Sequence, residues 1–79
     1  MEPLRIYLQD EPYDDEIAGH MSSTIRTADG KSWGTVETVI SGNKEINLVI
    51  WCGHVFECDN MDMLENQIQL VCPYPIKLS

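Results

Sequence analysis

Residues 45–58 read EINLVIWCGHVFEC and form the most apolar stretch of the chain. From residue 45 to residue 52 both alternating sets of side chains are largely apolar, which predicts a strand with two apolar faces. A strand of this kind normally lies inside a sheet that is covered on both sides. We therefore expect it to organise the core. Its second cover would be a helix, a loop or another copy of the chain.

Turn signals divide the neighbouring sequence into short runs that favour strands. Asp29-Gly30 separates two such runs and predicts a hairpin whose second arm is residues 32–40. Residues 41–44, SGNK, predict the next turn. Gly53-His54 predicts either a tight turn that returns residues 55–58 along the central strand, or a kink in one long strand. Gly34 predicts a bulge or a close approach of backbone.

The two ends of the chain are less regular. Residues 4–9 alternate like a half-buried strand, and residues 17–22 favour a helical turn or a loop before a β-prone run. Residues 59–70 predict one short helix, although residues 67–72 also have a strand pattern and residues 76–78 favour an extended tail. The fold class expected is α+β: a single domain over residues 1–79, with a small, mainly antiparallel sheet of four or five hairpin-connected strands and one short helix.

The charge balance is strongly acidic. Thirteen Asp and Glu against five Lys and Arg give a formal charge of −8 and a pI near 4.3. Direct binding to nucleic acid or to an anionic membrane needs a basic surface, so we expect neither. The charge favours a basic protein or nucleoprotein complex as partner. The competing interpretation is that the acidity serves solubility alone.

Residues 9–16, QDEPYDDE, concentrate carboxylates around a Pro and a Tyr and predict an exposed loop. A Tyr in such a loop has no core to fill, and aromatic rings beside carboxylates suit an interface with an Arg- or Lys-rich surface. Two further acids begin the predicted helix. The partner-binding residues predicted on this basis are Asp10, Glu11, Tyr13, Asp14, Asp15, Glu16, Asp59 and Asp62.

Three cysteines are an odd number, which argues against a disulfide framework. The N-terminal residues lack a secretory pattern, so we expect a soluble cytoplasmic protein. The cysteines are expected to be core residues. The alternative is a small zinc-stabilised module using Cys52, His54, Cys58 and Cys72. No phosphate loop, nucleophile elbow or metalloprotease motif is present, so we expect no cofactor and no enzymatic activity.

Small size, acidity and the lack of catalytic motifs together suggest a non-catalytic binding protein. Phage-encoded inhibitors such as anti-CRISPR proteins, and toxin-immunity proteins, share this general character; the likeness is one of size and composition and covers no motif. The hypothesis is that carboxylates mask a basic, nucleic-acid-handling protein by standing where it expects phosphates, in the host-cell cytoplasm if the chain is phage-encoded. The alternative hypothesis is a structural or assembly module that forms a homodimer or larger homo-oligomer through its two-sided apolar strand.

Overall fold

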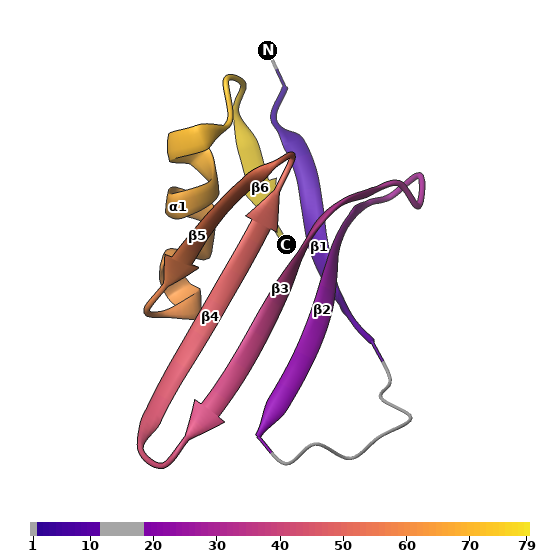
Figure 1. Cartoon of the computed structure of the whole chain (residues 1–79). Coiled ribbons are helices and arrows are strands. Elements are labelled where there is room, and N and C mark those ends of the chain that lie inside the picture. Colours follow the sequence, from indigo (N-terminus) through magenta and orange to yellow (C-terminus); the bar gives the residue numbers. More distant parts are fainter. Residues whose placement is uncertain (1, 12–18) are drawn as a thin grey trace.

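The computed structural model describes residues 2–11 and 19–79 as a curled six-stranded sheet with one short helix (Figure 1). The strand order is β5-β4-β3-β2-β1-β6, so β5 and β6 are the two edges. The helix α1 contacts both edge strands, and the sheet therefore curls around it. The elements are β1 (Leu4–Asp10), β2 (His20–Thr27), β3 (Ser32–Ser41), β4 (Lys44–Trp51), β5 (His54–Cys58), the 3₁₀ turn η1 (Met61–Met63), α1 (Leu64–Val71) and β6 (Ile76–Leu78).

The predicted class is confirmed in outline, but the expected sheet was too small and too uniform. Six strands form where four or five were expected, and β6 runs parallel to β1, with Leu4 opposite Ile76 and Ile6 opposite Leu78. Strand β2 already begins at His20, where a helical turn or loop was expected. The strand pattern of residues 67–72 is overridden, because a helix buries Ile68 completely against the sheet.

Hairpins join β2, β3, β4 and β5 in the order the turn signals predicted. The last turn differs by one residue: it consists of Cys52 and Gly53, with φ of 45° and 87°, and His54 already belongs to β5. Two positive φ angles in a two-residue loop indicate a type I′ turn, whose backbone twist matches the right-handed twist of the two strands that it joins. The expected kinked long strand is therefore wrong, and the tight turn is right except for its position.

Gly34 confirms the expected close approach of backbone. A Cβ atom added there would lie 1.9 Å from the carbonyl oxygen of Ile50 on the neighbouring strand. The expected bulge does not lie at Gly34 itself. The irregularity is on β2, where the register with β3 shifts between Ile25 and Arg26. Only glycine therefore lets β3 and β4 run together at this point.

The core lies between the sheet and α1. Val49 and Trp51 point toward the helix and are almost fully buried, whereas Leu48 and Ile50 point to the other face and remain 36% and 37% exposed. The described residues therefore cover only one of the two apolar faces of β4. The buried apolar side chains are Ile6, Ile25, Val36, Val49, Trp51, Cys58, Leu64, Ile68, Cys72 and Ile76.

One buried polar residue fixes the end of β5. Asn47 is fully buried; its Oδ1 accepts a hydrogen bond from Thr38 Oγ1 at 2.7 Å, and its Nδ2 donates to the carbonyl oxygen of Cys58 at 3.0 Å. These bonds tie β3, β4 and β5 together on the helix side. Buried polar groups of this kind specify register because an alternative pairing would leave them unsatisfied.

Among the residues that the structure describes, no helix is long and apolar enough to cross a membrane.

Candidate functional site

Acidic side chains gather at one end of the sheet. Strands β1 and β5 finish at this end, β2 begins there and the β3–β4 turn lies there. Two groups of residues predicted to bind a partner, at positions 10–11 and 59–62, therefore share an end of the sheet although they are far apart in sequence. Strands β1 and β5 are four strand spacings apart, about 19 Å along the sheet. Other residues must connect the two groups if they form one surface.

The register supplies the connection. Glu11 donates its backbone N–H to Ser22, Ser22 is opposite Glu37, Glu37 is opposite Leu48, and Leu48 is opposite Glu57. Glu11, Glu37 and Glu57 consequently form one line across the sheet, on the face that α1 does not cover. We call these three the carboxylate row. Adjacent members are separated by two strand spacings, about 10 Å.

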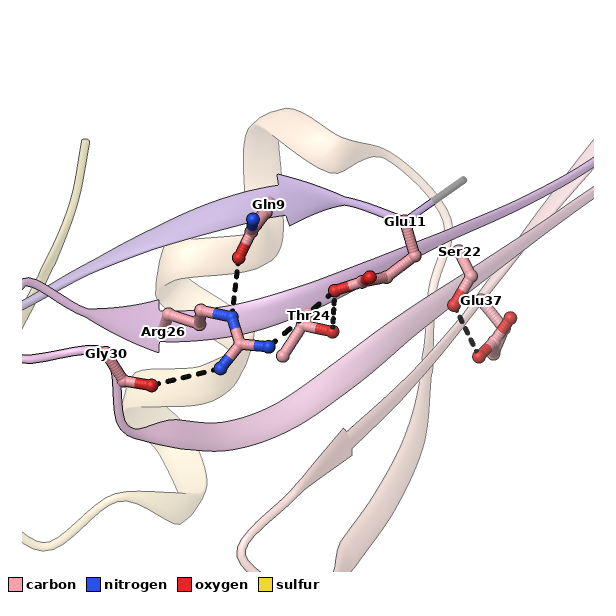
Figure 2. Close-up of polar contacts among 7 residues, drawn as sticks. All are labelled: Gln9, Glu11, Ser22, Thr24, Arg26, Gly30 and Glu37. Carbon is pink, nitrogen blue, oxygen red and sulfur yellow. Dashed lines mark hydrogen bonds and ion pairs between the residues drawn. The ribbon is translucent and has the colours of Figure 1, made fainter. Parts of the chain in front are cut away.

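Glu37, in the middle of the row, is held by the neighbouring strand. Its Oε1 accepts a hydrogen bond from Ser22 Oγ at 2.8 Å (Figure 2), and its Oε2 lies 3.0 Å from His20 Nε2. Its side chain nevertheless keeps about a third of its surface exposed, at 32%. The carboxylate is therefore both oriented and accessible.

Glu11, at one end of the row, is fixed by two partners on β2. Thr24 donates its hydroxyl to Glu11 Oε1 at 2.7 Å, and Arg26 approaches the same oxygen at 3.8 Å (Figure 2). Arg26 also donates to Gln9 Oε1 at 2.6 Å and to the carbonyl oxygen of Gly30 at 3.0 Å. The Arg26 guanidinium is therefore paired within the molecule. It holds Glu11, the residue that directly follows β1, in place.

Basic side chains lie mainly at the opposite end. Arg5 and Lys77 are opposite each other on β1 and β6, and Lys31 follows the β2–β3 turn, 4.3 Å above the ring of Trp33. At the acidic end the described residues include one Lys or Arg, Lys44, which is the first residue of β4. The two ends of the sheet therefore differ in charge, and the carboxylate row lies at the negative end.

Some of the residues predicted to bind a partner lie at the acidic end of the sheet. Asp59 is exposed just after β5, and Asp62 is exposed in η1, where its backbone N–H is capped by the Asn60 side chain at 2.9 Å. Asp10 accepts a hydrogen bond from Ser23 at 2.9 Å and belongs to the line of residues that faces the helix side. The remaining predicted residues, Tyr13, Asp14, Asp15 and Glu16, lie outside the described residues.

Glu37 and Glu57 are not singled out by the sequence pattern. Each stands alone among apolar or β-branched neighbours, in TVETVI and HVFEC, so neither forms a charge run. The available signal was the alternation of each strand, which points these acids away from the core. Their alignment with Glu11 depends on the hairpin registers, which the local sequence does not specify.

The structure does not form the zinc site considered as an alternative. His54 and Cys58 stand at the two ends of β5, about 13 Å apart along an extended strand. Cys52 is exposed in the turn, whereas Cys58 and Cys72 are buried. Across the described residues, no three His, Cys, Asp or Glu side chains are grouped closely enough to hold a metal ion.

Comparisons with known protein families, with curated proteins and with solved structures found no match to this chain.

Proposed function

We propose that this protein is a non-catalytic binding protein whose carboxylate row engages a basic surface on another protein. The observation that carries the proposal is the alignment of Glu11, Glu37 and Glu57 in one line across the acidic end of the sheet. A nucleic-acid-handling protein is the partner class that best fits, because such proteins display lysines and arginines arranged for phosphates. Occupying that surface would mask it, which is how an inhibitor or immunity protein of this size would act.

The geometry of the row favours specific recognition over general acidity. Carboxylates mounted on a sheet are spaced by the strand ladder, so little side-chain or loop ordering is needed when a partner binds. A spacing of about 10 Å equals roughly one Debye length near physiological salt, so each carboxylate acts as a separate point of attraction. Leu48 lies between Glu37 and Glu57 and is a third exposed, which offers an apolar seat for the methylene stem of a partner lysine or arginine.

The experiment is affinity capture from bacterial lysate with a salt gradient, run with matched charge variants. The test variant is Glu37→Gln with Glu57→Gln. The control is Glu2→Gln with Glu65→Gln, which changes the net charge equally at positions outside the row. We expect the wild type and the control to retain the same basic protein and the test variant to lose it. Equal loss in both variants would mean that only total charge matters, and equal retention would remove the row from the interface.

A second candidate function is self-association, and a separate observation favours it. Leu48, Ile50 and Val55 lie side by side on the face that α1 leaves uncovered, and Val55 is 63% exposed. This is the surface behind the hypothesis of an assembly module. The edge strand that carries Val55 defines how two copies would meet.

A further inference from the structure

Strand β5 presents an unpaired edge. It pairs with β4 on one side, and no described strand pairs with its other side (Figure 1). The pair Trp51–His54 closes the two-residue turn and so exchanges both backbone hydrogen bonds. Because bonded and non-bonded pairs then alternate, His54, Phe56 and Cys58 direct their backbone groups toward β4. Val55 and Glu57 direct theirs outward.

The opposite edge of the sheet is better protected against pairing than β5 is. Strand β6 has only three residues, follows directly on Pro75 and carries Lys77 at its centre, all features that discourage further pairing. Strand β5 has five residues, contains no proline or lysine and has a regular register with β4. Free edges recruit strands, and β5, whose charged residue is Glu57, has fewer features that oppose pairing than β6 has.

We infer that the outer edge of β5 pairs with β5 of a second copy, in antiparallel orientation about a two-fold axis at Phe56. This register places Val55 opposite Glu57 of the other copy, and Glu57 opposite its Val55. These are the residues with outward backbone groups, so both pairs exchange both bonds. Phe56, which is half-buried, is then opposite its own copy in a non-bonded pair, where side chains approach most closely. The result is one continuous sheet through two molecules.

Charge disfavours the register shifted toward Glu57, and the inferred register keeps the acidic ends of two copies apart. A shift by two residues in one direction would place Glu57 opposite Glu57, which is unfavourable. In the inferred register the carboxylate end of each β5 lies beside the Cys52-Gly53 turn of the other copy, where β4 and β5 carry no carboxylate. The two acidic ends therefore point away from each other. The carboxylate row stays on the open face of both copies, so this inference does not depend on binding to a basic partner; it rests on the second candidate function, self-association.

The test is sedimentation of the purified full chain from micromolar to millimolar concentration. Val55→Pro removes the outward N–H and leaves the bonds to β4 intact, so the fold should survive. Val55→Thr is the control, since it keeps the N–H and the β-branched shape. We expect a dimer for the wild type, a dissociation constant within about threefold of it for Val55→Thr, and at least about tenfold weaker association for Val55→Pro. Near-UV circular dichroism of the Trp33–Trp51 stack, whose ring centres are 5.8 Å apart, reports whether each variant is folded.

Salt and a cross-link separate this dimer from other associations. Two chains of charge −8 repel each other, so dimerisation should strengthen as salt rises, whereas binding of a basic partner should weaken. In a Cys52→Asn background, Phe56→Cys should form an intermolecular disulfide on mild oxidation, and Val39→Cys, exposed but away from the edge, should not. A monomeric wild type, an unaffected Val55→Pro dimer, or equal weakening by Val55→Thr and Val55→Pro would overturn the inference.

Discussion

Removing the side-chain amide of Asn47 should destabilise the fold by about 2 to 4 kcal/mol, because Asn47→Ala strands a buried hydroxyl and opens a small cavity. Thr38, 7% exposed, loses the acceptor that lies 2.7 Å from its hydroxyl. The carbonyl oxygen of Cys58 loses a side-chain donor at 3.0 Å. A loss of this size is a large part of the stability expected for so small a domain.

The assay is urea unfolding followed by Trp fluorescence and far-UV circular dichroism. Thr38→Val provides the matched change, since it removes the hydroxyl that Asn47→Ala strands. The double variant should then cost less than the sum of the single variants, by about 1 kcal/mol. A cost below about 1 kcal/mol for Asn47→Ala, or additivity of the two changes, would refute the reasoning that this amide fixes the β3–β4–β5 register.

Three further predictions concern the turns and a close backbone contact. Cys52→Asn should raise stability by about 0.5 to 1 kcal/mol in thermal unfolding, because asparagine tolerates the positive φ of 45° better and creates an Asn-Gly turn; a lower melting temperature would contradict this. Gly34→Ala should cost about 3 kcal/mol or more in urea unfolding, because the new Cβ would lie 1.9 Å from the carbonyl oxygen of Ile50; near-wild-type stability would show that β3 and β4 separate easily. The pKa of Asp29 is lowered by the hydrogen bond from Thr27 and then by a backbone N–H, so its folded pKa lies below its unfolded pKa and the carboxylate stabilises the fold above about pH 4. Asp29→Asn should therefore lower the melting temperature at neutral pH, with the difference from wild type narrowing as the pH falls below about 4; a difference that persists under acid would exclude this origin.

The hairpins were predictable because their signals are local. Asp29-Gly30 and residues 41–44 supply turn chemistry between β-prone runs, and three strands follow from them. The helix was predictable from the spacing of Leu64 and Ile68, both fully buried. The parallel pairing of β6 with β1 was not predictable. It involves only three residues of each strand, and the two strands lie at opposite ends of the chain, so no local turn signals the pairing.

The carboxylate row illustrates why the site was harder to predict than the fold. Had the turn consisted of Gly53 and His54, Glu57 would be opposite Ile50 and out of line with Glu37. The observed turn one residue earlier places Glu57 opposite Leu48 and completes the row. A surface made of single residues from separate strands depends on every intervening register, whereas an acidic run is visible in the sequence itself.

The measurement that tests the central claim most directly is the salt dependence of affinity for the basic protein recovered by capture. Dissociation constants of the wild type, Glu37→Gln with Glu57→Gln, and Glu2→Gln with Glu65→Gln would be measured over a range of salt concentrations. The account predicts that the first pair of changes weakens binding by about tenfold or more and flattens the salt dependence, while the second pair leaves both nearly unchanged. Equal affinities and equal slopes for all three proteins would contradict a binding function of the carboxylate row.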